Sequence, residues 1–205
     1  MIINPLLDRD ADLSHLFNLE RRNIPFVLLE EVHGLKANLV DVDNVQSARE
    51  ITSYLFDLGH ENIVHFAGPK YSMHSDERLE GVRQAFFDTH QVYSGDHVVR
   101  AGGARMEDGY RTGLEYFEGR PASERPTAVS CYNDPVAIGL LRALRELNID
   151  VPGEVSVTGF DNIETCDYAP VPLTSMGMPT TEMAVRRRRC SSARSRPPAR
   201  KSRRS

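Results

Sequence analysis

The sequence lacks the features of a membrane-spanning, secreted or disulfide-linked protein. No stretch approaches the ~18 consecutive apolar residues that a membrane helix needs. The beginning of the chain shows no basic run followed by a long apolar segment, so we expect no secretory signal. Cys131, Cys166 and Cys190 are scattered without a CxxC pair, which argues against a disulfide framework or a zinc site. We therefore expect a cytoplasmic protein with no membrane contact, no metal and no cofactor.

The common catalytic and nucleotide-binding motifs are also missing. The sequence has no GxGxxG, no P-loop, no GxSxG elbow and no cluster with metal-ligand spacing. Asp161 could be imagined as an acid/base partner of His65 or His60. His65 falls inside a predicted strand, however, and His60 reads as a turn residue. We therefore expect that the chain is not an enzyme.

Basic residues are scarce in most of the chain and abundant at its end. Residues 1–183 carry 15 basic and 29 acidic residues, a net charge of −14, whereas residues 184–205 contain nine Arg, one Lys and no acid. An acidic body repels phosphate backbones, so we expect no nucleic-acid surface on it. Basic runs can signal nucleic-acid binding or nuclear targeting. Residues 184–205 have too few apolar residues to pack as a helix, and we interpret them as a disordered or out-of-frame tail without an assigned function.

The apolar pattern alternates between short buried runs and helical spacing. It predicts strands over 1–6, 26–29, 37–42, 62–67, 97–100, 127–131 and 155–159, and helices over 11–22, 44–58, 76–89, 107–118 and 134–147. Such alternation predicts an α/β fold with parallel sheets flanked by helices. Ligands of open parallel sheets bind beyond the carboxyl ends of the strands. The segments to inspect are therefore 68–78, 131–135 and 159–162.

Arg78 is the first candidate in these segments. The pattern places it in the first turn of the helix over 76–89, where the helix dipole disfavours a cation. A bidentate contact to a ligand oxygen or carboxylate would compensate. The alternative is a surface arginine paired with Glu77 or Asp76.

Asn133 and Asp161 are the next candidates. Asp134 precedes Pro135 at a helix start and has the pattern of a helix cap, which leaves Asn133 free to point toward the region of Arg78. Asp161 follows a strand that ends in glycine. It is either a turn residue or a carboxylate that accepts hydrogen bonds from two neighbouring sugar hydroxyls.

The order and spacing of these segments resemble the sensor region of the LacI/GalR family. The resemblance covers roughly residues 1–183 and depends on these motifs: Leu58-Gly59-His60, Gly68-Pro69, Arg78-Leu79-Glu80-Gly81, Asp108-Gly109-Tyr110-Arg111, Arg125-Pro126-Thr127, Asn133-Asp134-Pro135, Val151-Pro152-Gly153-Glu154, Thr158-Gly159-Phe160-Asp161-Asn162 and Pro172-Leu173-Thr174-Ser175. It implies a two-lobed, periplasmic-binding-protein-like (type I) fold, with an effector bound between the lobes.

The resemblance also implies how the chain is divided. Residues 1–44 would form part of a first lobe, 45–173 the second lobe, and 174–183 a return segment to the first lobe, followed by the tail 184–205. Family members usually open with a helix-turn-helix headpiece, a hinge helix and a first βα unit. The sequence begins on what looks like the second strand of the first lobe, so we expect an incomplete first lobe.

Five site residues follow from the match, position by position. Arg78 corresponds to the ligand-gripping arginine of the family's Arg-x-x-Gly motif. Asn133 and Asp161 correspond to polar contacts from the next two strand ends. Glu30 corresponds to a first-lobe position that often carries an acid. His74, in the loop expected before Arg78, is a weaker candidate whose alternative is a solvated loop histidine.

The function that the resemblance implies is ligand sensing. A small sugar-like effector would close the lobes and control operator DNA binding by a headpiece that the sequence lacks. In relatives that bind aromatic bases, an aromatic residue stacks on the base from the loop equivalent to 102–105. That loop has no ring here, which favours a sugar over a purine. Relatives dimerise through their sensor lobes, so a homodimer is a candidate assembly. The alternative function is a sugar-binding protein of a transport system.

Overall fold

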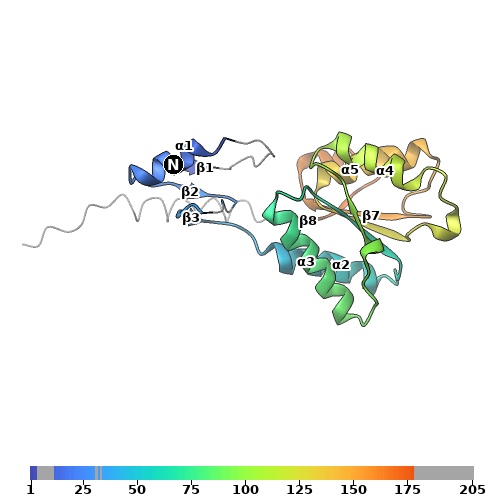
Figure 1. Cartoon of the computed structure of the whole chain (residues 1–205). Helices are drawn as coiled ribbons and strands as arrows, with labels where there is room; N and C mark the ends of the chain where they lie inside the picture. Colours follow the sequence, from blue (N-terminus) through green and yellow to red (C-terminus); the bar gives the residue numbers. More distant parts are fainter. Residues whose placement is uncertain (4–11, 31, 33, 178–205) are drawn as a thin grey trace, which may run out of the picture. The chain divides into compact units, whose positions relative to one another are not determined.

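The computed structural model describes residues 1–3, 12–30, 32 and 34–177, and these residues form two units (Figure 1). The smaller unit comprises residues 1–42, and the larger one begins at Asp43. The predicted tail over 184–205 and residues 178–183 of the predicted return segment lie outside the described residues. None of the helices described is both long and apolar enough to traverse a bilayer.

The smaller unit is a three-stranded parallel sheet with one helix. Strands β1 (Ile2–Ile3), β2 (Val27–Leu28) and β3 (Asn38–Leu39) pair in that order, and helix α1 (Ser14–Arg21) follows β1 in the chain. Each strand has two residues, fewer than the apolar runs predicted. Four buried apolar side chains of the unit form one cluster: Leu16, Phe26, Leu28 and Val32.

The larger unit alternates strands and helices as predicted. Its helices are α2 (Asn44–Asp57), α3 (Met73–Asp88), α4 (Met106–Phe117) and α5 (Asp134–Glu146), with short 3₁₀ helices at Gly95–His97, Ala122–Glu124 and Glu164–Tyr168. Its strands are β4 (Ile63–Ala67), β5 (Val98–Arg100), β6 (Ala128–Cys131), β7 (Ser156–Asp161) and β8 (Thr174–Gly177). The strands form one parallel sheet in the order β5-β4-β6-β7-β8. The predicted α/β fold is thus confirmed.

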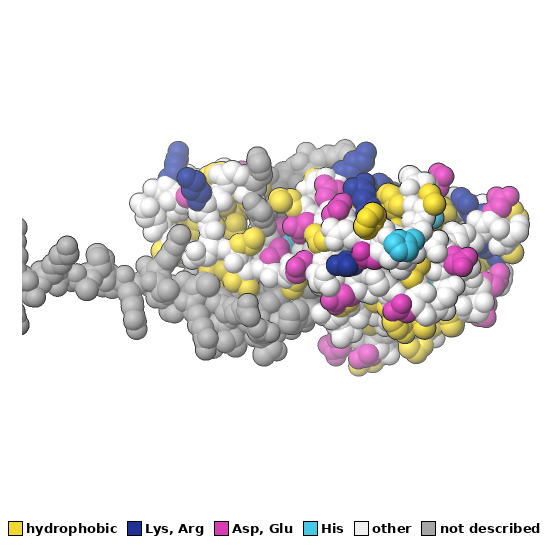
Figure 2. Space-filling model, turned by 90° about the horizontal axis from the view of Figure 1, so that it is seen from below, with side chains coloured by type: hydrophobic (Ala, Val, Ile, Leu, Met, Phe, Trp, Pro, Cys, Tyr) yellow, Lys and Arg dark blue, Asp and Glu magenta, His cyan; other side chains and the backbone are white. Residues whose placement is uncertain are grey.

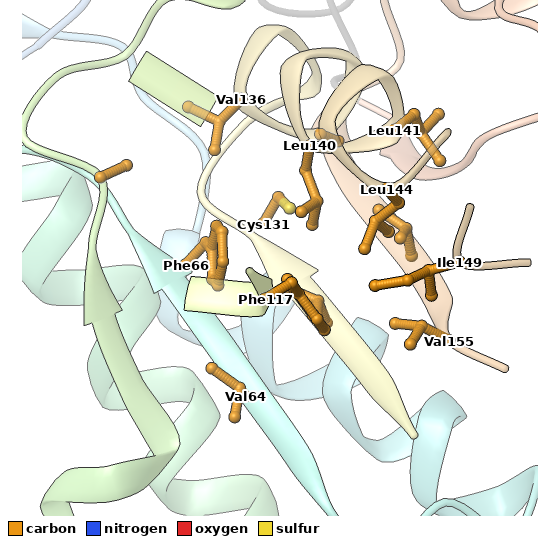
Figure 3. Packing of buried hydrophobic residues seen from close by; sticks show 14 residues of the cluster. Val64, Phe66, Phe117, Cys131, Val136, Leu140, Leu141, Leu144, Ile149 and Val155 are labelled. Atoms are coloured by element: carbon orange, nitrogen blue, oxygen red, sulfur yellow. The ribbon is translucent and has the colours of Figure 1, made fainter. Parts of the chain in front are cut away.

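Helices cover both faces of this sheet (Figure 1). Helices α4 and α5 pack on one face over a large apolar cluster that includes Phe66, Phe117 and Leu140 (Figure 3). Helices α2 and α3 pack on the other face over a smaller cluster around Phe86: Leu55, Ile63, Val82, Phe86 and Ala128. The division of apolar residues between the two faces follows from alternate residues of each strand pointing to opposite sides.

Three details of the larger unit differ from the sequence predictions. Helix α3 begins at Met73 rather than at residue 76, because the Ser72 hydroxyl accepts from the backbone N–H of Ser75 and caps the helix. Helix α5 is capped by Asn133 and not by Asp134. Residues 174–177, predicted as the start of a return segment, form edge strand β8 of the sheet. The first two differences change how the site is assembled.

Candidate functional site

The carboxyl ends of β4 and β6 mark the place where the chain changes direction across the sheet. These strands are neighbours, although β5, on the other side of β4, lies between them in sequence. Parallel sheets bind ligands at such a switch point. Gly68 follows β4, and a Cβ atom there would lie 2.7 Å from the ring of Tyr132, which follows β6. Glycine at position 68 therefore lets the Tyr132 ring lie against the backbone of the neighbouring loop.

Arg78 lies at this switch point with its side chain buried. Only 4% of the residue is exposed. Its Nε donates to Oδ1 of Asn44 (2.9 Å), its Nη1 to the carbonyl of Tyr132 (2.6 Å) and its Nη2 to Oδ1 of Asp161 (3.4 Å). The guanidinium carbon is 3.7 Å from the centre of the Phe160 ring and 4.9 Å from that of Tyr132. A carboxylate, two neutral oxygens and two ring faces together stabilise the buried cation.

This environment corrects the position expected for Arg78 and its surface pairing, while a contact between Arg78 and a ligand stays a prediction. Because α3 begins at Met73, Arg78 lies in its second turn, and the helix dipole does not call for a ligand to compensate its charge. The surface pairing with Glu77 or Asp76 is wrong as well. Glu77 accepts from Nδ2 of Asn44 (3.0 Å), and Asp76 lies 3.5 Å from Arg100.

Asp161 ends strand β7 beside the guanidinium of Arg78. Its φ of 105° and the φ of 51° at Asn162 are unusual for residues with side chains, and each costs on the order of 1 kcal/mol. Burial raises the pKa of Asp161 to about 6, with the positive charge of Arg78 acting in the opposite direction and the negative charge of Asp134 adding to the rise. The side chain keeps 31% exposure, and within the described residues only Oδ1 has a bond. Oδ2 is therefore open to a ligand hydroxyl.

Asp134 holds the turn that follows Asp161. It is fully buried, and its Oδ2 accepts from the backbone N–H of Ile163 (2.8 Å). Its Oδ1 accepts from the hydroxyl of Ser175 (2.6 Å), which in turn accepts from the N–H of Asn162 (3.0 Å). A strained turn next to a site is thus fixed by a carboxylate that the sequence had suggested as a helix cap.

Asn133 is engaged in local structure. Its Oδ1 accepts from the N–H of Val136 (2.9 Å) and caps α5, while its Nδ2 donates to the carbonyl of Ala104 (3.0 Å). The expectation that its side chain is spare is wrong, since both ends of the amide have partners. The backbone carbonyl of the preceding residue, Tyr132, takes the bond from Arg78 instead. A direct contact between Asn133 and a ligand stays a prediction.

His74 and Glu30 complete the predicted set. His74 lies in the first turn of α3 rather than in a loop, because the helix begins early. It is half-buried, and a positive charge on it would lower the pKa of Asp161, so it lies near the site. Glu30 is half-buried in the smaller unit, two residues beyond β2. Its part in ligand binding stays a prediction.

Four residues of the site escaped the sequence analysis: Asn44, Tyr132, Phe160 and Ser175. Tyr132 and Phe160 stand beside candidates that were chosen, and aromatic neighbours of a buried arginine are a usable signal. Asn44 looked like an ordinary residue at a helix start. Ser175 stands in a segment without an apolar run. The last two are recognised only through partners far away in sequence.

The described surface carries both signs of charge. Acidic side chains are distributed over the face in view in Figure 2, with basic side chains between them. Among the residues coloured in that view, no continuous basic area forms of the kind that binds a phosphate backbone. The candidate site instead has the partly exposed carboxylate of Asp161 beside the buried guanidinium of Arg78, which contacts two aromatic rings. Such a set can bind hydroxyl groups.

Comparisons with known proteins identify the family of the chain. Residues 52–187 match the family model described as a periplasmic binding protein-like domain. The arabinose metabolism transcriptional repressor of Halalkalibacterium halodurans is 31% identical over 182 residues, which cover 86% of this chain and 47% of the repressor. The chain spans about half the length of the curated relatives it matches.

Solved structures of LacI-type regulators superpose on the chain. A LacI-family regulatory protein from Chloroflexus aggregans superposes with a TM-score of 0.81 at 25% identity, covering 94% of this chain and 67% of that one. A complex of the transcriptional regulator CelR with cellobiose gives 0.81 at 28% identity, covering 94% and 58%. The chain therefore belongs to the periplasmic binding protein-like domain family, in the form found in LacI/GalR-type transcriptional regulators.

Proposed function

We propose that this chain is the ligand-sensing domain of a LacI-type regulator and that it binds a small sugar or sugar derivative at Arg78 and Asp161. The observation that carries the proposal is the pairing of these two side chains at the carboxyl edge of the sheet (3.4 Å), with Oδ2 of Asp161 and part of its side chain left accessible. An ionised carboxylate accepts from two neighbouring hydroxyls, which is the pattern that a sugar presents.

The relatives support both the role and the ligand class. The names of the curated relatives are those of repressors, and the CelR structure holds cellobiose. The loop over 102–105 offers no ring for stacking a base. Binding would shift a balance between conformations of the sensor domain. Operator DNA would be bound by a headpiece elsewhere in the full protein, which would act in the cytoplasm and could assemble as a homodimer.

We further propose that the domain does not catalyse a reaction. The two histidines considered as acid/base partners have other roles in the structure. The His65 side chain is buried in β4, and Nδ1 lies 3.0 Å from the carbonyl of Ser130; burial lowers its pKa to about 4. The Nδ1 of His60 lies 3.0 Å from the hydroxyl of Thr127, at the other end of the sheet. Unchanged cellobiose after long incubation with the protein is the expected result.

A thermal-shift screen of the full chain tests the proposed ligand class. The panel contains cellobiose, L-arabinose, D-glucose, D-ribose, their available phosphates and the purine base adenine. A ligand that binds only the folded state raises the unfolding midpoint, by about 2.7 kcal/mol of stability at 100 times its Kd. A rise with a sugar supports the proposal. A rise with adenine alone, or with no compound of the panel, contradicts it.

Titration calorimetry with the sugar that gives the largest rise then tests the site. Arg78→Ala should weaken binding at least ~30-fold, because it leaves the carboxylate of Asp161 without its cation. The matched control is Arg125→Ala, which removes an arginine paired with Glu154 (2.8 Å) near the amino end of β6. The control should bind like the native chain. Full affinity in the Arg78→Ala variant would move the site elsewhere.

The transport alternative has its own test. The gene sequence upstream of this coding region should encode a helix-turn-helix segment if the protein is a regulator. A secretory signal peptide there would favour a transport protein instead.

A further inference from the structure

Two side chains near the borders of the larger unit hydrogen-bond to the Arg78–Asp161 site. Asn44 is the second residue of the unit, which begins at Asp43. Ser175 lies in strand β8. Asn44 bonds Arg78 itself, and Ser175 bonds the turn that follows Asp161.

Asn44 orients the guanidinium of Arg78. It is buried, and its Oδ1 accepts from Nε of Arg78 (2.9 Å) while its Nδ2 donates to Oε2 of Glu77 (3.0 Å). The two bonds define the direction of the amide, because a reversed amide would place a donor against each donor and an acceptor against each acceptor. With Nε fixed by Asn44, the two Nη groups face Tyr132 and Asp161.

Ser175 orients the turn that carries Asp161. Its hydroxyl accepts from the N–H of Asn162 (3.0 Å) and donates to Oδ1 of Asp134 (2.6 Å). Asp134 also accepts from the N–H of Ile163 (2.8 Å), so both residues after Asp161 are held by this pair. A backbone with positive φ at two successive residues persists only where its surroundings fix it.

We propose that Asn44 and Ser175 are positioning residues of the effector site, which hold Arg78 and Asp161 in the binding geometry. The proposal rests on the proposed function for the identity of the site. The hydrogen bonds that hold the two residues all lie within the larger unit.

The first test needs no ligand and reads the titration of Asp161 by carboxyl ¹³C NMR in the full chain, with Asp161→Asn assigning the signal. The charged groups acting on this carboxyl are Arg78, Asp134 and His74. Asn44→Ala frees Arg78 from its place, so the midpoint of Asp161 should rise. Ser175→Ala releases the turn and hydrates the carboxylate, so the midpoint should fall. Thr52→Ala, which removes another buried hydrogen bond of the unit, should leave the midpoint unchanged.

The second test measures affinity for cellobiose by titration calorimetry. Asn44→Ala and Ser175→Ala should each weaken binding about tenfold, which corresponds to the net contribution of one hydrogen bond. Ser175→Thr retains the hydroxyl and should restore most of the affinity. The double variant N44D/E77Q exchanges donor and acceptor between positions 44 and 77, leaves the net charge unchanged and keeps an oxygen facing Arg78. It should also bind better than Asn44→Ala, and it serves if that variant fails to fold.

The two proposals fail in different ways. If the native chain binds no sugar of the panel, the proposed ligand class is wrong, and the NMR titration alone still decides whether Asn44 and Ser175 position the two residues. If Asp161 titrates at the native midpoint in every folded variant that removes these contacts, the positioning proposal is overturned. The same holds if Ser175→Thr and N44D/E77Q bind no better than the alanine variants.

Discussion

The two faces of the five-stranded sheet are built from different chemistry. The face under α4 and α5 is apolar, with Phe66, Val129 and Leu140 in one continuous cluster (Figure 3). The face under α2 and α3 carries a row of polar side chains across three neighbouring strands. In this row His65 pairs with Ser130, and Ser130 with Thr158, each only 2% exposed. Strands of a parallel sheet buried on both faces are normally apolar throughout, so the polar row is a departure that needs a cause.

The polar row lies near the proposed binding site. Arg78 lies on α3, which packs on the polar face, and burial together with the positive charge of Arg78 lowers the pKa of His65. Polar groups buried in this layer cost free energy unless they are hydrogen-bonded. Two buried side-chain polar atoms in the described part of the chain have no hydrogen-bond partner, His65 Nε2 and Thr158 Oγ1. One face of the sheet thus supplies stability, while the other gives up part of it near Arg78.

The largest expected effect comes from truncation on the apolar face. Phe66 is fully buried against Tyr116, with ring centroids 5.7 Å apart. Phe66→Ala should lower the free energy of unfolding by about 3–5 kcal/mol, through lost burial and the cavity left behind. Urea unfolding followed by far-UV circular dichroism measures it, since the chain has no Trp.

Phe87→Ala is the matched control for this truncation. Phe87 lies in the last turn of α3, and 80% of its surface is exposed. The same substitution there should change stability by no more than about 0.5 kcal/mol. Equal losses at the two positions would contradict the assignment of stability to the apolar face.

The next-largest loss of stability is expected from glycines at the contacts between paired helices, one pair on each face of the sheet. A Cβ atom on Gly139 of α5 would collide with the carbonyl of Met106 in α4, and one on Gly81 of α3 with the carbonyl of Val45 in α2. Both alanine variants should therefore lose about 1–3 kcal/mol of stability by overpacking. Only Gly81→Ala should also weaken binding of the sugar selected by the thermal-shift screen, because it displaces the helix that carries Arg78.

Gly95→Ala is the control for these two variants, since a Cβ atom there meets nothing within 4 Å. It should be close to native in both stability and affinity. Weakened sugar binding in Gly139→Ala to the same extent as in Gly81→Ala would show that the two faces are not functionally distinct.

The sequence predicted the framework of the larger unit well, because its elements depend on local apolar spacing. Helix α2 was predicted over 44–58 and spans Asn44–Asp57, and β6 was predicted over 127–131 and spans Ala128–Cys131. Strand β8 was missed because Thr174–Gly177 has no apolar run, and its pairing with β7 is a tertiary effect. Asn133 and Asp134 are both good helix caps. The carboxylate of Asp134 is bonded to Ile163 and Ser175, and Asn133 caps α5 instead. The sequence does not show these long-range bonds.

The site was predicted less completely than the fold. Arg78 and Asp161 were found and lie together, yet the predicted reasons for Arg78 were wrong. Its partners stand 34, 54 and 83 residues away in sequence. Contacts over such separations leave no periodic pattern in the chain, so spacing could identify the candidates but not their hydrogen bonds.

A smaller effect separates two titrating groups near Arg78, namely Asp161 and His65. Burial raises the pKa of Asp161 from 3.8 to about 6, so the native state binds the extra proton and stability falls as pH rises through this window. Burial lowers the pKa of His65 from 6.5 to about 4, so the unfolded state binds the extra proton and stability rises with pH. The two slopes oppose each other between about pH 4 and pH 6.

Removing either group should expose the slope of the other. Asp161→Asn should lose stability more steeply than the native chain on acidification from pH 6.5, and His65→Gln less steeply, each by on the order of 1 kcal/mol. Urea unfolding across this pH range gives the slopes. Parallel curves for the native chain and both variants would mean that neither group titrates differently in the folded state.

The smallest effect is expected from removing a buried hydroxyl that has no partner. Thr158 lies in β7 on the polar face, and Val has the same branched shape without the hydroxyl. Thr158→Val should leave stability unchanged or raise it by up to about 1 kcal/mol, because no hydrogen bond is lost and an unpaired polar atom is removed from the interior.

On the other face, the hydroxyl of Thr112 donates to the carbonyl of Ala101 (3.4 Å). Thr112→Val should therefore lose about 0.5–1 kcal/mol. A larger loss for Thr158→Val than for Thr112→Val would mean that the Thr158 hydroxyl is hydrogen-bonded in solution, and the polar face would then cost the fold less than its contacts indicate.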